Sequence, residues 1–510
     1  MRNYIFLLLI GIALSLTSCR EDFQFEPSTG DLTFSRDTVY LDTVFTDIGS
    51  STYTLKVYNK SSKDISIPTI QLGKGLASKY RMTVDGMTGT DNKIFNNVEI
   101  LAKDSMYIFI ETTANIADAN PTDFLYTDQI QFDGGTNLQS VELVTLIKDA
   151  YFLYPKRFAD GTTETLPIGD EEIYGFYLDE NDPINGDEFT WNNSKPYVIY
   201  GYAAVPTGKT LTVEAGARIH FHADSGLIVG NGGSLKVEGG VSTTEALENE
   251  VIFEGDRLEP VFSDVPGQWG TIWLTDGSTG NEIDHLTLKN AVYGLLIDNN
   301  DGNYMTIKNT QIYNCSNIGI YAKTAKIQGE NIVINSAGQF SLACTLGGSY
   351  EFKQCTFNNN TSSSKQLAVL INNYYTDENN QAVGFNLAQA EFSNCIIFGS
   401  NQVELLLDKN ESGAWTTPVF SKCQIKFNNS NNQFTDNPDY AFINDTSTII
   451  KNGTPDFFNA NNNQLIIGAD SDGNNFGDDL GITTDVIGTT RIVTANKVDI
   501  GAYQHVVFPD

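Results

Sequence analysis

The stretch that decides the fold spans residues 283–425 and opens with Ile283-Asp-His-Leu-Thr-Leu288. Its pattern, apolar-x-x-z-x-apolar, recurs at 283–288, 307–312, 327–332, 352–357, 392–397 and 420–425. Successive copies start 24, 20, 25, 40 and 28 residues apart. A repeat of this size cannot bury its own apolar face, so neighbouring copies must stack and share one core.

A second pattern alternates with the first and consists of a short apolar run closed by a polar residue. It occurs at 295–298, 320–323, 342–345, 370–373 and 405–408, so each repeat carries at least two short strands. The connections are rich in Asn, Gly and Ser, which accept tight-turn and left-handed backbone conformations. A coil of this kind places each strand parallel to its equivalent, about 4.8 Å away, with right-handed crossovers. The pattern predicts a right-handed parallel β-helix.

The aromatic and cysteine positions of this repeat predict a stacked core. Phe352, Phe392 and Phe420 open three copies, and Cys355, Cys395 and Cys423 share the z position, so each set is expected to form a column. The interval from 352 to 392 requires either an inserted loop or an extra coil. Residues 372–380, rich in Tyr, Asn and acidic side chains, favour the loop.

Composition limits the classes of partner. The chain has 510 residues, 40% of them hydrophobic, with 31 basic against 63 acidic residues and a formal charge of -32. This length and apolar share allow several domains with real cores. The charge argues against binding nucleic acid or anionic lipid, because both require a basic face.

The first residues are typical of a targeting segment. Arg2 precedes an apolar run at 4–16, which is too short to span a bilayer comfortably, and Leu16-Thr-Ser-Cys19 follows it. This ending resembles the lipobox of bacterial lipoproteins, which implies a signal peptide at 1–18 and a lipidated Cys19 within a tether at 19–24. The acidic Arg20-Glu-Asp22 resembles the export signal of Bacteroidota-type surface lipoproteins. The resemblance implies an outer-membrane, lipid-anchored protein that faces the exterior and contacts the membrane through its anchor only.

Five further cysteines, at 315, 344, 355, 395 and 423, make an odd set. An odd count in an exported protein argues against a complete disulfide framework, so free buried thiols are favoured over a bridged pair.

Residues 25–150 alternate apolar and polar residues in short runs, which is typical of an antiparallel sandwich. Val57-Tyr-Asn-Lys-Ser-Ser62 and Tyr126-Thr-Asp-Gln-Ile-Gln-Phe132 resemble immunoglobulin-like modules of the Hydin type, which act as spacers or binding units. The irregular, acidic segment 151–194 is predicted to be a linker or an N-terminal cap.

Coils are expected to begin at Tyr197, with the β-helix over 195–430 and the last coils and a C-terminal cap over 431–510. Leu211-Thr-Val-Glu-Ala-Gly-Ala-Arg-Ile-His-Phe221 resembles the opening coils of parallel β-helix proteins of bacterial surfaces, and Trp269 and Trp273 fit the same coil-packing pattern. Asp485-Val-Ile-Gly-Thr-Thr-Arg491 with Asp499-Ile-Gly-Ala-Tyr503 resembles their C-terminal closure. The resemblance implies a structural role for Arg491, paired with Asp485 or Asp499.

The wider β-helix class includes pectate-lyase-like enzymes and glycoside hydrolases, so catalysis is one alternative. Glycosidases need two carboxylates about 5–9.5 Å apart, which one or two coil heights supply. Asp276, Asp298 and Asp301 are therefore candidates. Lys323 follows Asp298 by one coil, and a surface ion pair is favoured over a catalytic base and acid. Lyases need a basic residue, yet Arg218 and Arg257 are the only arginines between 195 and 480.

Two other kinds of site are considered. Asp470-Ser-Asp472-Gly-Asn474 resembles a calcium loop, but its glycine comes early and no Glu closes it, so a solvated turn is favoured over a calcium cofactor. Tyr374, Tyr375 and Trp415 lie in polar loops, where a ring can stack on a sugar or cover the coil flank.

The leading functional hypothesis is a noncatalytic surface lipoprotein that binds a polysaccharide or a host or cell-surface glycan, or acts in adhesion, through the flank of the helix. The alternatives are a polysaccharide lyase or glycoside hydrolase and a purely structural surface component.

Overall fold

The computed structural model describes residues 24–300, 302–361 and 365–509, in which short strands dominate and the helices are brief 3-10 turns. Cys19 and Asp301 lie outside the described residues. The chain folds into two compact units, with the boundary between Asp149 and Ala150. Within the described residues, no helix is both long enough and apolar enough to cross a membrane.

The first unit consists of two mainly antiparallel sheets that share one core. Val39, Ile130 and Leu143 of one sheet pack with Leu55 and Ile108 of the other. The first sheet comprises β1 (Glu26–Pro27), β3 (Thr38–Phe45), β5 (Ile65–Leu72), β7 (Ile94–Ile100), β9 (Leu125–Phe132) and β10 (Gln139–Lys148). The second comprises β2 (Thr33–Phe34), β4 (Tyr53–Tyr58), β6 (Tyr80–Val84) and β8 (Ser105–Thr112), and the 3-10 turns are η1 (Gly75–Ala77), η2 (Ile116–Asp118) and η3 (Gly135–Asn137).

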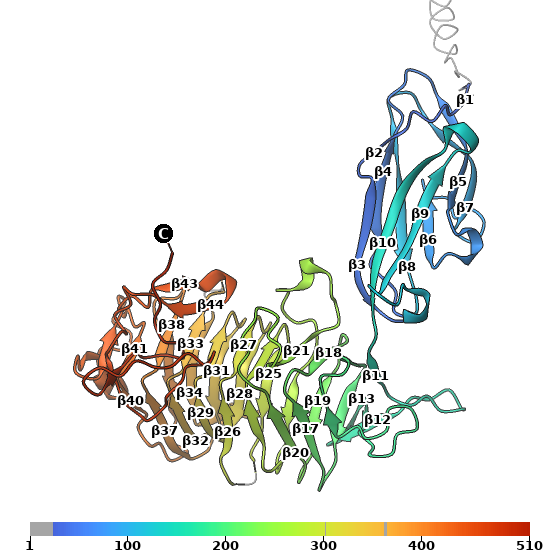
Figure 1. The fold of residues 1–510 in the computed structure, drawn as a ribbon. Coiled ribbons are helices and arrows are strands. Elements are labelled where there is room, and N and C mark those ends of the chain that lie inside the picture. The colour runs from blue at the N-terminus through green and yellow to red at the C-terminus, as the bar shows by residue number, and fades with distance from the viewer. Residues whose placement is uncertain (1–23, 301, 362–364, 510) are drawn as a thin grey trace, which may run out of the picture. The chain divides into compact units, whose positions relative to one another are not determined.

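The second unit is a stack of coils whose strands form three long parallel sheets, visible as successive rungs in Figure 1. Sheet 1 comprises β11 (Tyr151–Leu153), β15 (Tyr197–Ile199), β18 (Arg218–Phe221), β21 (Val251–Gly255), β24 (Leu286–Lys289), β27 (Gln311–Tyr313), β30 (Val333–Asn335), β33 (Thr356–Asn359), β38 (Ile396–Gly399), β41 (Cys423–Ile425) and β42 (Ile449–Lys451). Sheet 2 comprises β12 (Thr165–Ile168), β13 (Glu171–Tyr177), β16 (Tyr202–Val205), β19 (Gly226–Val229), β22 (Ile272–Leu274), β25 (Tyr293–Ile297), β28 (Ile318–Lys323), β31 (Phe340–Thr345), β34 (Leu367–Asn372) and β39 (Leu405–Asp408). Sheet 3 comprises β14 (Thr190–Trp191), β17 (Thr210–Glu214), β20 (Ser234–Glu238), β23 (Glu282–Asp284), β26 (Met305–Lys308), β29 (Lys326–Glu330), β32 (Gly348–Lys353), β37 (Leu387–Ser393) and β40 (Val419–Ser421).

The predicted all-β chain with stacked parallel coils is confirmed, and each coil contributes three strands. The coils also begin earlier than Tyr197, because β11, β13 and β14 of the segment 151–194 already pair in parallel with the next coil. That segment contains the first coil together with a hairpin between β12 and β13.

The first sequence pattern spans a corner between sheets 3 and 1. Its third residue adopts a left-handed conformation in the five copies that start at 283, 307, 352, 392 and 420, as His285 does with φ 50° and Asn394 with φ 55°. One such residue turns the chain, so the apolar side chains before and after it both point into the core. The corner explains why the spacing matches neither a strand nor a helix.

The register of the third copy differs from the prediction by two residues. Gly329, and not Ile327, pairs with Ile307 on one side and Phe352 on the other. The copy is therefore Gly-Glu-Asn-Ile-Val-Ile at 329–334, and the starts of the second, third and fourth copies lie 22 and 23 residues apart. A Cβ on Gly329 would lie 2.5 Å from Cδ1 of Phe352, which shows that the neighbouring ring fills this position.

The predicted core columns are confirmed. Phe352, Phe392 and Phe420 pair in register, with ring centroids 5.2 and 5.0 Å apart, and all three are buried. The predicted loop is confirmed as well, because a hairpin of β35 (Tyr374–Thr376) and β36 (Ala382–Gly384) is inserted between β34 and β37. The five described cysteines are free and buried, as favoured from the sequence.

The C-terminal region has two parts with different positions. Residues 427–444, here called the cap, include η5 (Pro438–Asn444), whose Tyr440 and Ile443 join the coil core. Residues 452–509, here called the strap, lie along the outer face of sheet 1, where Leu465, Val486 and Tyr503 pack on Val333. Figure 1 shows this red segment beside β33 and β38. The strap contains β43 (Phe457–Asn459), η6 (Ala460–Asn462), β44 (Gln464–Ile467), β45 (Gly477–Asp478) and β46 (Lys497–Val498), while η4 (Pro260–Phe262) belongs to an earlier loop.

Arg491 is structural, but its partners differ from the expected aspartates. Its buried guanidinium donates to Oδ1 of Asn331 at 2.8 Å and to the carbonyl oxygen of Gly501 at 3.0 Å. Asn331 is the left-handed corner residue of its coil, so Arg491 fixes the strap to a corner of the stack.

Candidate functional site

The outer face of sheet 2 carries a continuous column of apolar and aromatic side chains. The second sequence pattern produces it, because residues alternate inward and outward along each strand and the middle apolar residue of each run points outward. The register places one such residue from each coil in line, here called the flank column: Tyr177, Ala204, Ile228, Trp273, Leu296, Tyr321, Ala343, Leu370 and Leu406. The inward neighbours, such as Leu295 and Ile320, belong to the coil core.

One copy of the second pattern is shifted from its predicted place. Val369 pairs with Leu342 and Leu405, so the run is 369–372 and not 370–373. Leu370 accordingly belongs to the outward column and packs with Ile318 and Ala343.

Sheets 1 and 2 differ in the segments that pack on their outer faces. The strap packs on the outer face of sheet 1 over its later strands, at Val333 and Ile396. On the outer face of sheet 2, Leu166 of β12 contacts Ala204 and Ile228, and Leu406 lines a hollow with Phe434 of the cap. Trp273, Leu296 and Tyr321 are partly exposed neighbours in the column, whereas Ala343 and Leu370 are buried and Leu406 is again partly exposed. Neighbouring apolar side chains at the surface are candidates for an interaction site.

A groove of about 570 Å³ opens at Trp273, between β12 and the flank column. Ile168, Tyr177 and Ile228 form its apolar lining, and Asp276 and Asp298 lie on its polar side. The volume is in the range of small-ligand sites, and an aromatic ring beside carboxylates suits a sugar, which offers a C–H face and hydroxyl groups. Trp269 is buried and stacked on Phe221, as expected, so the two tryptophans of the motif have different roles.

A polar column borders the flank column at or just after the ends of β25, β28, β31, β34 and β39. Lys323, Thr345, Asn372 and Asp408 follow one another in register, and Asp298 stands before Lys323. The predicted ion pair is confirmed, with Lys323 Nζ 2.6 Å from Oδ1 of Asp298. The apolar strip therefore has an edge of hydrogen-bonding groups along its length.

Asp298 is engaged at both oxygens. Oδ2 accepts a hydrogen bond of 2.7 Å from Nε1 of Trp273, while Oδ1 contacts Lys323. Asp276 Oδ1 accepts from Nδ2 of Asn299 at 2.8 Å and is otherwise directed to solvent at the groove. Because both oxygens already have partners, the arrangement suits Asp298 for orienting the indole of Trp273.

The two arginines considered for a lyase are bound elsewhere. Arg218 donates to the carbonyl oxygens of Glu250 at 2.7 Å and of Leu247 at 2.7 Å, so it holds a loop against sheet 1. Burial lowers the pKa of its guanidinium, and Glu254 and Glu250 act in the opposite direction. Arg257 forms an exposed ion pair with Glu259.

The three loop aromatics separate into two groups. Tyr374 donates from its hydroxyl to Oδ1 of Asp408 at 3.1 Å, so it joins the end of the polar column, and the charge of Asp408 raises the pKa of Tyr374. Tyr375 follows it in the hairpin and is 47% exposed. Trp415 packs against the coil core and bridges to Leu387, which favours the covering role.

The residues of the calcium-like loop point to different partners. Asp472 Oδ2 accepts from the backbone N–H of Thr454 at 2.6 Å, and Asn474 donates to the carbonyl oxygens of Gly468 and Ala469 at 3.0 Å each. Asp470 is exposed. In the described residues, no group of three or more His, Cys, Asp or Glu side chains is placed to hold a metal ion.

Comparisons with known proteins do not assign the chain to a family. No family model matches the chain, and no curated protein does. Among solved structures, a family 123 glycoside hydrolase from Clostridium perfringens is 11% identical with a TM-score of 0.16, covering 23% of this chain and 26% of that one. PapD-like domain 7 of human CEP192 is 11% identical, with a TM-score of 0.15 over 26% of this chain and 96% of its own. The E. coli chaperone DraB is also 11% identical, with a TM-score of 0.16 over 29% and 80%.

The chain thus spans about a quarter of the glycoside hydrolase that it matches. With TM-scores this low, the three likenesses carry no argument about function. The class defined by the coordinates is an all-β protein with a parallel coil stack.

Proposed function

We propose that this chain is a surface lipoprotein that binds carbohydrate, without cleaving it, through the flank of sheet 2. The observation that carries the proposal is the flank column itself, an outward row of apolar and aromatic side chains bordered by a polar row. A polysaccharide has the matching chemistry, because its sugar rings present C–H faces and its hydroxyls donate and accept hydrogen bonds. Since the column repeats with every coil, it suits a chain laid along the stack.

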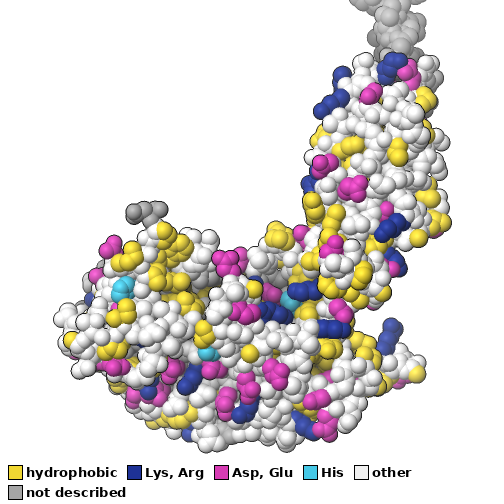
Figure 2. Space-filling view, viewed as in Figure 1, with side chains coloured by type: hydrophobic (Ala, Val, Ile, Leu, Met, Phe, Trp, Pro, Cys, Tyr) yellow, Lys and Arg dark blue, Asp and Glu magenta, His cyan; other side chains and the backbone are white. Residues whose placement is uncertain are grey.

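The proposed cellular setting comes from the sequence. Cys19 would carry the acyl anchor in the outer membrane of a Bacteroidota-type cell, facing the exterior, and the first unit would act as an immunoglobulin-like spacer. A lipid anchor leaves the flank free to meet a glycan on the same or another cell, including a host surface, which would also serve adhesion. Acidic and basic side chains are interspersed on the face shown in Figure 2, which suits a neutral ligand better than a polyanion.

Trp273→Ala is the direct test. The indole is the largest side chain on the groove and is held in place by Asp298, so its loss should weaken retention on the bound glycan about tenfold or more, or about 1.4 kcal/mol. Tyr304→Ala is the matched control, because Tyr304 is 40% exposed beside sheet 3 and lies off the flank. Affinity electrophoresis of the wild type and both variants in gels containing neutral or acidic polysaccharides measures the effect.

The same glycans distinguish binding from catalysis. Unchanged glycan after prolonged incubation is the expected result. New reducing ends would favour a glycoside hydrolase, and unsaturated uronate products would favour a pectate-lyase-like enzyme. Either kind of product would overturn the noncatalytic proposal. Equal retention of the wild type and Trp273→Ala on every bound glycan would remove the flank as the binding surface.

A further inference from the structure

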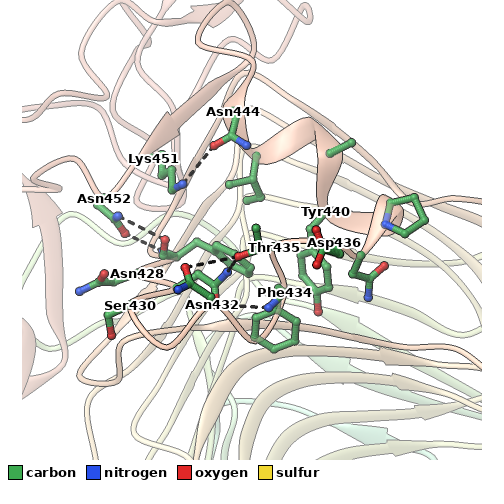
Figure 3. Close-up of a pocket in the computed structure, with 16 residues that line it drawn as sticks. Asn428, Ser430, Asn432, Phe434, Thr435, Asp436, Tyr440, Asn444, Lys451 and Asn452 are labelled. Atoms are coloured by element: carbon green, nitrogen blue, oxygen red, sulfur yellow. Dashed lines mark hydrogen bonds between the residues drawn. The ribbon is translucent and has the colours of Figure 1, made fainter.

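The cap carries a second cavity, of about 550 Å³, at the closing end of the coil stack (Figure 3). Its wall is built by residues 427–438 and by η5, which the core holds in place. Tyr440 is 4% exposed, and its hydroxyl oxygen accepts a hydrogen bond of 2.7 Å from the backbone N–H of Leu407. The cavity therefore lies on a fixed framework that is tied to sheet 2 by a buried contact.

Three aromatic rings form an apolar base for the cavity. The ring centroids of Phe434 and Tyr440 are 4.8 Å apart, and those of Phe427 lie 5.5 and 5.0 Å from them. Phe427 and Tyr440 are buried, whereas Phe434 is half-buried and lies at the cavity in Figure 3. The mutual packing fixes the orientation of the Phe434 ring, so a ligand that stacks on it meets a preorganised surface.

The rest of the lining is rich in side-chain amides, from Asn428, Asn429, Asn432, Asn437, Asn444 and Asn452. An amide donates through its nitrogen and accepts through its oxygen, which are the two roles that a sugar hydroxyl requires of its partner. Charges are few: Lys451 donates to Oδ1 of Asn444 at 3.1 Å, and Asp436 is exposed opposite it. One cation and one anion leave the lining without net charge.

We propose that the cap cavity is a second saccharide-binding site, which takes a short neutral saccharide on the face of Phe434. It stands on residues separate from Trp273 and its groove, so it holds whether or not the flank binds a polymer. Neutral sugars are favoured over uronates because Lys451 is already bound to Asn444 and the chain has a formal charge of -32.

The test uses titration calorimetry of the full chain with neutral gluco-, manno- and galacto-configured trisaccharides and with trigalacturonate. Ser430→Trp should block the cavity, because Ser430 is exposed and lines it. Thr446→Trp is the matched control, since Thr446 is exposed just after η5 and outside the lining. Asn432→Gly removes one amide whose side-chain contact within the cap is a 3.5 Å bond from Thr435. Glycine accepts the left-handed backbone of this position, with φ 58°, so the variant leaves the cap framework in place.

The expected result is binding of at least one neutral trisaccharide by the wild type, a loss of affinity of tenfold or more in Ser430→Trp, and a smaller loss in Asn432→Gly. Thr446→Trp and Trp273→Ala should bind it as the wild type does, which separates this site from the flank. The proposal is overturned if no neutral trisaccharide binds, if trigalacturonate binds in preference, or if Asn432→Gly and Ser430→Trp both retain wild-type affinity. Should Ser430→Trp fail to fold, Asn432→Gly alone decides between these outcomes.

Discussion

Gly329→Ala is predicted to destabilise the second unit although it adds one methyl group. Gly329 pairs in register with Ile307 and Phe352, at the point where every other copy of the corner pattern has a larger apolar residue. A Cβ built there lies 2.5 Å from Cδ1 of Phe352 and 2.7 Å from Cδ1 of Ile332. Both neighbours are fully buried, so neither has free space into which it can move.

The magnitude follows from two opposing terms. Forcing an extra methyl into a packed core costs about 1–3 kcal/mol, because neighbouring side chains leave their preferred rotamers. Replacing glycine restricts the unfolded chain and returns about 0.4–1 kcal/mol, since Gly329 is not in the left-handed region and alanine can adopt its backbone conformation. The net loss in the free energy of unfolding is therefore about 1–2 kcal/mol.

Urea unfolding followed by tryptophan fluorescence measures this loss in the right place. The chain has four tryptophans, Trp191, Trp269, Trp273 and Trp415, and all lie in the second unit, so the signal does not report the first unit. Gly240→Ala is the control, because the nearest atom to its added Cβ is 3.6 Å away, an ordinary contact. It should leave the urea midpoint unchanged or raise it slightly.

A compensating change sharpens the test. Phe352→Leu removes the ring atoms that meet the new methyl group, so Gly329→Ala should cost less in the Phe352→Leu background than in the wild type. Stabilisation by Gly329→Ala, or equal costs in the two backgrounds, would refute the assigned register. Ile327 would then regain the position that the sequence pattern alone suggests.

Three further outcomes are expected. Burial raises the pKa of Glu404 to about 7 from 4.5, against the lowering effect of hydrogen bonds from the N–H groups of Asn401 and Ala368. The folded chain thus holds a proton that the unfolded chain loses, so the contribution of Glu404 to stability is fully present below pH 4.5 and falls by about 3 kcal/mol as the pH rises to 7 and above. Glu404→Gln should remove that slope in urea midpoints measured at pH 4.5 and 8, and an unchanged slope would contradict the assignment. Arg491→Ala should release the strap, because hydrogen bonds to a charged group contribute about 1.5–3 kcal/mol each. Limited proteolysis should then cut residues 452–509 faster than in the wild type. Equal cleavage rates would contradict the role of Arg491 in fixing the strap to Asn331. Burial raises the pKa of the Cys395 and Cys423 thiols, so an aromatic disulfide reagent should label them only after denaturation, whereas rapid labelling of the native protein would show that the cysteine column is open.

Much of the coil stack could be predicted because its signals are local. Each signal involves only a few adjacent positions. A corner needs a left-handed residue with an apolar residue on either side of it, and a strand end needs a polar residue. Phe352, Phe392 and Phe420 therefore stack as predicted, and the acidic, Tyr-rich insertion forms a hairpin. The sequence pattern misplaces the third copy because Gly329 has no side chain that would mark it, and the ring of Phe352 shows why none fits there.

The sequence predicts some residues of the candidate site but not the face of the sheet that carries it. Asp276, Asp298 and Lys323 could be chosen from their spacing, and the ion pair between Asp298 and Lys323 follows from their place one coil apart. The sequence pattern predicts a packing role for Trp273 as for Trp269, since the two occupy similar places in one motif. In the structure, Trp273 lies in β22 and its register with Ile228 and Leu296 places it in the outward column, whereas Trp269 precedes the strand and is buried.

The sequence by itself determined that the chain forms stacked coils, because repeats that cannot fold alone have to bury their apolar faces on one another. Only the tertiary structure decided which outer face stays open. The strap binds corner residues such as Asn331, Gln354 and Asn394, more than 80 positions earlier in the chain, and so covers sheet 1. Contacts between such distant segments have no local pattern. They leave uncovered the partly exposed side chains of the flank column, such as Trp273 and Tyr321, on which the proposed function rests.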